Sequence, residues 1–209
     1  MKVKALSSND QGGEPNTKTL ILGKAVSLFS QKGFKGVSMR ELSTASGVTP
    51  AALYYYFPNK KVLHEAAIVY AYRDRAKPAV ENLQETELEP IEILENFVFR
   101  LCERFYNDPE FRRLVQWTLL DSETDEVINN IIIKVVYDSH FDALKFFLKG
   151  FNSKFDPYRL TIFIFGMVMQ NYFTLAVRSP RDDFKKSKET PDKITKEIMA
   201  LLTTAIIKE

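Results

Sequence analysis

The sequence is poor in the residues that build cross-linked or metal-held folds. It has one cysteine, Cys102, and two histidines among 209 residues. A single cysteine excludes an intramolecular disulfide framework and a cysteine-cluster zinc site. Because Cys102 lies in an apolar helical pattern, we predict a buried, unreactive thiol, with a reactive thiol as the alternative.

Glycine, proline and long apolar runs are also scarce. Eight glycines and nine prolines favour long helices over a turn-rich β fold. The most apolar stretch, residues 160–169, is too short to span a bilayer, and the N-terminus lacks the apolar run of a signal peptide. We therefore expect a soluble, cytoplasmic protein with no membrane partner.

Sequence motifs of catalysis are missing. There is no glycine-rich phosphate loop, and His64 and His140 lie in different helical segments without a motif-level neighbour for nucleophilic or metal chemistry. Both histidines are explained as solvated or satisfied helix residues. We expect no enzyme activity, no cofactor and no metal.

What the chain does contain is an apolar fraction of 45% and an uneven charge distribution. The first predicts a substantial core. The net charge is only +2, but residues 17–61 hold seven basic residues against one acid, while residues 62–209 hold 20 basic and 24 acidic residues. A concentrated positive charge of +6 suits a module that faces DNA. The alternative is a chance cluster of solvated lysines.

The stretch from Ser38 to Lys61 is the most informative part of the sequence. Ser38 and Glu41 have the spacing of a capping box, in which the hydroxyl accepts from the Glu41 amide and the carboxylate reaches back to the Ser38 amide. Leu42 and Ala45 would share one side of the helix. Gly47 then permits the left-handed conformation of a sharp turn.

A second short helix is predicted directly after this turn. Val48 can fill the space between the helices, Thr49 can cap the second one, and Pro50 fits its first position. Pro58 would end it. Two short helices joined by a glycine-containing turn indicate a helix-turn-helix, whose second helix reads the DNA major groove.

Helical periodicity continues along the rest of the chain. A helix over Thr17–Lys32 would share a core of Phe29, Leu42, Val48, Leu53 and Phe57 with the helix-turn-helix. Further helices are predicted over Lys60 to about Gln84, Pro90–Tyr106, Pro109–Leu120, about Thr124 to Leu148, Pro157–Arg178 and Pro191–Ile207. The fold class is therefore all-α.

The run from Ala25 to Leu63 resembles the N-terminal domain of the TetR family of bacterial transcriptional regulators. The shared pattern includes Phe-x-x-x-Gly-Phe, Ser/Thr-x-Arg-x-Leu, Ala-x-Gly-Val and Leu-Tyr-x-Tyr-Phe-x-x-Lys. The resemblance implies an N-terminal three-helix DNA-binding domain (residues 17–61) after a flexible arm (residues 1–16). A larger C-terminal helical domain for ligand binding and dimerisation would cover residues 62–209.

The resemblance and the motif together place eight residues at DNA: Ser38, Arg40, Thr49, Pro50, Ala51, Tyr54, Tyr55 and Lys60. Arg40 would reach a base edge, or alternatively a phosphate or a surface partner. Lys60 matches the family's phosphate-binding lysine. The tip formed by residues 49–51 is poor in donors, so DNA shape and water would contribute to recognition. Tyr56 is assigned to packing in the head, with a DNA contact as the alternative.

The resemblance also implies a homodimer and an effector. The last two long helices, residues 157–178 and 191–207, would pair with their copies in a four-helix bundle, or alternatively complete the core of one chain. A small, largely apolar or aromatic effector would lie among the middle helices. Its candidate wall is Phe97, Leu101, Phe105, Trp117, Phe163 and Met167, with Gln170 and Asn171 as polar anchors. Ordinary core packing is the alternative for each apolar residue.

The sequence thus predicts a repressor that binds a pseudo-palindromic double-stranded operator as a homodimer. Binding of the effector would fix a spacing of the two DNA-binding heads that no longer fits the half-sites. The alternative is a DNA-binding regulator without a small-molecule inducer, acting as an activator or through a protein partner.

Overall fold

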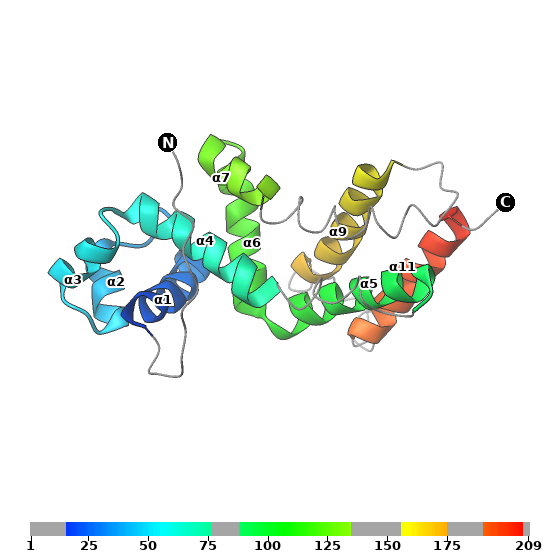
Figure 1. Cartoon of the computed structure of the whole chain (residues 1–209), viewed down its shortest axis with the longest axis horizontal. Coiled ribbons are helices and arrows are strands. Elements are labelled where there is room, and N and C mark those ends of the chain that lie inside the picture. Colours follow the sequence, from blue (N-terminus) through cyan, green and yellow to red (C-terminus); the bar gives the residue numbers. More distant parts are fainter. Residues whose placement is uncertain (1–15, 77–87, 135–155, 175–189, 207–209) are drawn as a thin grey trace.

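The computed structural model describes residues 16–76, 88–134, 156–174 and 190–206, and every regular element in these ranges is a helix. The all-α prediction is confirmed. The elements, in chain order, are α1 (Thr17–Lys32), α2 (Met39–Ser46), α3 (Pro50–Tyr56), α4 (Lys60–Ala76), α5 (Pro90–Asn107), α6 (Pro109–Ser122), α7 (Glu126–Ile132), α9 (Pro157–Phe173) and α11 (Pro191–Ile206) (Figure 1).

The first three helices form a compact head. Phe29, Leu42, Leu53 and Phe57 are buried in its core, as predicted, and Val48 is partly buried against them. Each such side chain contributes about 1.5–3 kcal/mol when it leaves water. The short helices α2 and α3 are therefore held by this shared core rather than by their own helix propensity.

The side of α2 that carries Leu42 is not buried throughout. Ala45 is exposed, whereas Ser43 and Ser46 of the same helix are buried. The hydroxyl of Ser43 donates to the carbonyl of Arg40 within α2, so its burial costs little. Small polar residues can take core positions in this way, which an apolar pattern does not reveal.

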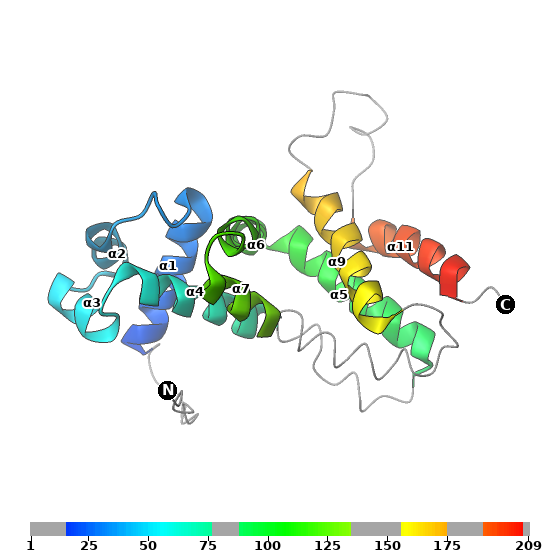
Figure 2. The same cartoon turned by 90° about the horizontal axis from the view of Figure 1, so that it is seen from above.

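The packing of the head extends beyond the helix-turn-helix. Helix α1 packs against both α4 and α6, and α6 packs against α7. Figures 1 and 2 show α1–α3 at one end of the molecule, α5, α9 and α11 at the other, and α4 and α6 between them. The predicted domain boundary between residues 61 and 62 falls inside the continuous helix α4.

The far end is a bundle in which α5 packs against α11 and α9. Cys102 of α5 is fully buried there, as predicted. Burial raises the pKa of its thiol to about 11. Since the thiolate is the reactive form, this cysteine is unreactive near neutral pH.

Several predictions fall outside the described residues. These are the N-terminal arm, the kink at Pro78, His140, and the predicted continuations of α4, α7 and α11. The predicted end of α9 near Arg178 is wrong, because the helix ends at Phe173 and Thr174 leaves the helical conformation as its C-cap. The ends of α5 and α6 match closely: α5 ends at Asn107 rather than Tyr106, and α6 at Ser122 rather than Leu120. Across the described ranges, the structure has no helix that is both long and apolar enough to cross a membrane.

Candidate nucleic-acid interface

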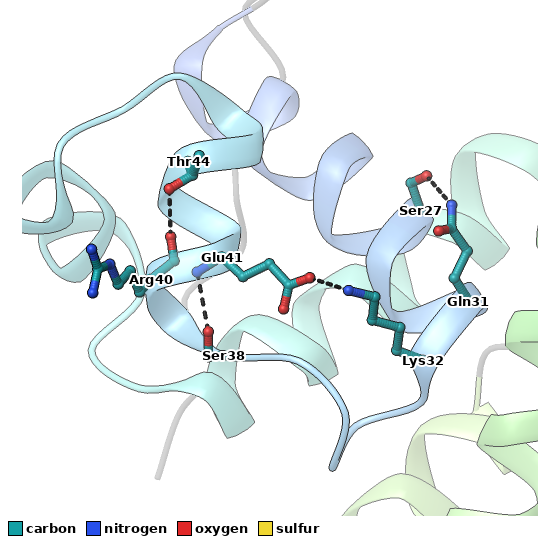
Figure 3. A network of polar contacts seen from close by, with 7 residues as sticks. All are labelled: Ser27, Gln31, Lys32, Ser38, Arg40, Glu41 and Thr44. Carbon is teal, nitrogen blue, oxygen red and sulfur yellow. Dashed lines mark hydrogen bonds and ion pairs between the residues drawn. The ribbon is translucent and has the colours of Figure 1, made fainter.

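The interface begins at the cap of α2. The Ser38 hydroxyl accepts a hydrogen bond from the Glu41 amide at 3.1 Å, as the capping box predicts. The second half of the box differs, because the Glu41 carboxylate instead pairs with the ammonium of Lys32 at the end of α1 (Figure 3). The ammonium holds the pKa of Glu41 below its ordinary value.

This ion pair also affects which positive charges the surface of the head presents to a ligand. Lys32 and Glu41 neutralise one another on the side of α2 that faces α1. Arg40 is exposed, and in Figure 3 its guanidinium points away from the ion pair. Arg40 therefore keeps its charge available on the outer surface of α2.

The turn between α2 and α3 has the predicted geometry. Gly47 has φ 66° and ψ 22°, and its amide donates to the carbonyls of Ser43 and Thr44. The Thr49 hydroxyl then accepts from the Ala52 amide at 3.1 Å. That hydroxyl keeps its own hydrogen free to donate outward. The motif is a helix-turn-helix with both helices capped by their own side chains.

The outer face of α3 carries aromatic rings rather than charges. Thr49, Pro50 and Ala51 are exposed at its tip. Tyr54 and Tyr55 are 51% and 83% exposed. Both tyrosines are therefore accessible to a binding partner. Tyr56, by contrast, packs against the core of the head, as predicted.

Lys60 lies at the start of α4, and its ammonium forms hydrogen bonds within the head. Its ammonium donates to the carbonyls of Phe34 at 3.0 Å and Val37 at 2.9 Å, and it stands 4.4 Å from the centroid of the Phe34 ring. These contacts use two of its three N–H donors, which leaves one for a phosphate. The lysine thus ties the segment between α1 and α2 to α4, a role that the sequence analysis missed.

We expect Lys60→Met to destabilise the protein by about 1–3 kcal/mol. The substitution leaves the part-buried carbonyls of Phe34 and Val37 without their donor. Urea denaturation followed by far-UV circular dichroism measures this loss.

The adjacent lysine supplies the matched control. Lys61 makes one exposed ion pair, at 2.8 Å, with Asp125 at the N-cap of α7. Exposed pairs contribute little, so Lys61→Met should leave the urea midpoint nearly unchanged. Equal midpoints for the two variants would contradict the structural role of Lys60.

His64 was expected to be solvated or satisfied, but it is buried without a hydrogen-bond partner among the described residues. It is 3% exposed, and its ring lies 4.6 Å from that of Phe29 and 4.9 Å from that of Phe34. Burial lowers the pKa of His64 to about 4, with Lys60 acting in the same direction and Asp125 opposing it. The imidazole is therefore neutral at physiological pH. No group of metal-ligating side chains is found in the ranges that the structure describes.

The eight predicted effector residues lie in different environments. Phe97, Leu101 and Phe105 are buried in the far bundle, Met167 is partly buried, and Phe163 is exposed. Gln170 is exposed, and the Asn171 amide donates to the Met167 carbonyl within α9.

Trp117 lies apart from the other seven predicted effector residues. It lines a cavity formed by α1, α6 and α9, and none of the other seven lines that cavity. Apolar periodicity could place each residue on a helix face, but it could not say which faces meet.

Comparison with known proteins supports the motif. Residues 21–67 match the sequence profile of the family described as bacterial regulatory proteins, tetR family. The protein named "Probable HTH-type transcriptional regulator YttP" of Bacillus subtilis is 30% identical over 127 residues, which is 58% of this chain and 60% of that protein.

The biofilm operon icaADBC HTH-type negative transcriptional regulator IcaR of Staphylococcus aureus (strain Newman) is 27% identical over 114 residues, 54% of this chain and 59% of that protein. The matches with YttP and IcaR thus span about 60% of the relatives' own length.

Solved structures share the architecture. The crystal structure of AibR in complex with isovaleryl coenzyme A and operator DNA has a TM-score of 0.67 and 20% identity. That similarity covers 89% of this chain and 97% of AibR. GusR of Salmonella enterica has a TM-score of 0.68 and 18% identity, covering 92% and 96%. At these identities the likeness concerns the fold.

Proposed function

This chain belongs to the TetR family of bacterial regulatory proteins through residues 21–67, and on that basis we propose that it is a transcriptional repressor that binds a double-stranded operator. The observation that carries the proposal is the exposed outer face of α2 and α3, capped by Ser38 and Thr49 and presenting Arg40, Tyr54 and Tyr55. Relatives matched along this stretch are named as transcriptional regulators, which also argues against an enzyme.

The interface divides into groups that position the head and groups that read bases. The phosphate contacts are assigned to Ser38, Thr49, Lys60 and the tyrosine hydroxyls. Lys60 offers its one remaining donor near the start of α4, where the helix dipole also attracts an anion. Pro50 and Ala51 lack polar side-chain groups, so they can contact only a thymine methyl.

Arg40 is then the one side chain of the proposed interface that can make a bidentate contact with a guanine. It is exposed and turned away from the Lys32–Glu41 pair. Reading would otherwise depend on the shape and deformability of the operator. Because few side chains can contact base edges directly, we expect Arg40 to have a strong influence on which operator sequences are bound.

We also propose that the protein acts as a homodimer through α9 and α11. Large apolar side chains stay exposed on these helices: Tyr158, Ile162 and Phe163 on α9, and Leu201 on α11. Apolar patches of this kind mark association surfaces. A two-fold dimer matches a pseudo-palindromic operator with half-sites about one helical turn apart.

Control by a small molecule completes the proposal. AibR, which shares the fold, is solved with isovaleryl coenzyme A and operator DNA, and IcaR is named a negative regulator. We infer that a largely apolar or aromatic effector releases this protein from its operator. The alternative is a regulator without an inducer, controlled by a protein partner or acting as an activator; a screen of effectors against operator release separates the two.

Selection of bound sequences from random duplex DNA tests the function and the role of Arg40 together. The wild type should enrich a palindromic consensus. Arg40→Ala should lose discrimination at one symmetric pair of positions by about 5- to 150-fold, since one bidentate pair contributes about 1–3 kcal/mol of discrimination.

Lys24→Ala is the control, because it removes an exposed charge of α1 without touching α2 or α3. This variant should keep the wild-type consensus. Recovery of no consensus by the wild type would refute the DNA-binding proposal. A uniform loss for Arg40→Ala across all sequences would reduce Arg40 to a phosphate contact.

A further inference from the structure

A cavity of about 620 Å³ opens where the head meets the rest of the molecule. Its walls come from the end of α1, the exposed face of α6 and the last residue of α9. This volume lies within the range of small-molecule sites, about 300–1,000 Å³. The cavity is separate from the face of α2 and α3 that is proposed to bind DNA.

The floor of the cavity is apolar and partly aromatic. Trp117 and Leu120 of α6 and Phe173 of α9 contribute to it, and Leu120 remains 59% exposed while Trp117 is 39% exposed. An indole this accessible, with the phenyl ring of Phe173 lining the same cavity, offers a stacking surface for a flat ring. The apolar side chains of this cavity are therefore accessible to a ligand.

One edge of the cavity is positively charged. Arg113 is exposed, and no described residue forms an ion pair or hydrogen bond with its guanidinium. Burial lowers the pKa of the neighbouring Arg112, and the positive charge of Arg113 is the second largest cause of that lowering. Glu123 lies at the other end of the lining face, ten residues further along, which is about 15 Å in a helix. It therefore does not neutralise Arg113.

We propose that this cavity binds a small aromatic organic anion, a carboxylate or a sulfonate. The ring lies against Trp117 and Phe173, and the acid group takes the guanidinium of Arg113 in a bidentate contact. The side-chain amides of Gln31 and Gln116 line the same space and can bond to further polar groups of the ligand. As a statement about effector control, this inference rests on the proposed function.

The position of Trp117 connects this site to the head. Its ring packs directly on Gly33 at the end of α1, where a Cβ atom would lie only 3.1 Å from Cδ2 and Cε3. Ser30 and Gln31 of α1 line the cavity itself. A ligand that stacks on Trp117 would therefore lie against α1, one of the three helices of the head. A ligand that binds one placement of α1 more tightly than another would shift the balance between them.

The single tryptophan of the chain makes occupancy directly observable. Titration of the full-length protein with 8-anilinonaphthalene-1-sulfonate should quench the emission of Trp117 by energy transfer and saturate. Arg113→Gln should weaken this binding about 10- to 100-fold, because a hydrogen-bonded charge pair is lost. The anion 2-naphthoate should displace the probe, and the neutral 2-naphthol should compete far less.

Arg159→Gln is the matched control. It removes the same type of charge from an exposed position near the start of α9, at the opposite end of that helix from Phe173. It should bind the probe as the wild type does. Absence of tryptophan quenching, equal weakening by the two variants, or equal competition by 2-naphthol would each overturn the proposal.

The two proposals fail in different ways. Arg113→Gln should keep the wild-type operator affinity in the absence of ligand, because Arg113 belongs to α6, which Figure 1 shows apart from α3. If the protein selects no DNA sequence, the repressor proposal fails while the binding titration stands. If DNA is bound but the probe is not, only the anion site fails.

Discussion

Replacing Gly33 with alanine should lower the free energy of unfolding by about 2–5 kcal/mol, a large part of the stability of a typical domain. Two causes act together. Gly33 has φ 65° and ψ 176°, a conformation open in practice only to glycine. The added Cβ would also meet the indole of Trp117 at 3.1 Å, so the indole must shift by a few tenths of an ångström within its contact between α1 and α6. Urea denaturation followed by far-UV circular dichroism gives the value.

Gly47→Ala separates the two causes. Gly47 also has a positive φ, 66°, but its ψ of 22° lies in the left-handed helical region, and a Cβ there would meet nothing within 4 Å. Its expected cost is only about 1–2 kcal/mol. The fluorescence of Trp117 should shift in Gly33→Ala and remain unchanged in Gly47→Ala. Equal losses of stability with unchanged fluorescence in both would show that the packing against Trp117 contributes nothing.

The second large effect is a loss of stability in acid caused by His64. Its pKa is about 4 in the folded protein and 6.5 in the unfolded chain. Well above pH 6.5 the ring is neutral in both states, so His64 makes the free energy of unfolding no more dependent on pH there. As the pH falls from 6.5 towards 4, only the unfolded state binds the proton, and stability declines. Between pH 7 and pH 4 this residue should remove about 3 kcal/mol.

His64→Phe tests this assignment, because phenylalanine keeps a ring between Phe29 and Phe34 without a titrating group. Unfolding free energies from urea series at several pH values should fall less steeply in the variant, by about 3 kcal/mol over the range. Lys60 and Asp125, the charged groups that act on His64, are retained. His64→Leu is a second variant without a titrating group, for the case in which the larger phenylalanine ring fits poorly. Parallel curves for the wild type and both variants would contradict the buried neutral histidine.

Much of the fold was predictable from short-range patterns. The start of α2 followed from Ser38, that of α3 from Thr49 and Pro50, and the turn between them from Gly47. Proline at the first turn also marked α5, α6 and α9 correctly. These signals are local, because a cap satisfies backbone groups only a few residues away.

The proposed DNA-facing residues could be named from the motif, but their surroundings could not. The capping pattern predicted that Glu41 would bond to its own helix, yet Lys32 takes the carboxylate across the space between α1 and α2. Lys60 matched a phosphate-binding position, yet it also holds the carbonyls of Phe34 and Val37. A charged side chain follows whichever partner the packing of the helices brings within reach.

Local sequence therefore decided where helices begin and turn, which face of each is apolar, and that the head is a helix-turn-helix. Only the tertiary structure decided which faces meet. It placed Trp117 on Gly33 rather than beside Phe97, and it buried His64 between two rings that lie 35 and 30 residues earlier in the chain. The physical reason is that hydrogen bonds of caps and turns depend on neighbours along the chain, whereas burial depends on the simultaneous packing of distant helices.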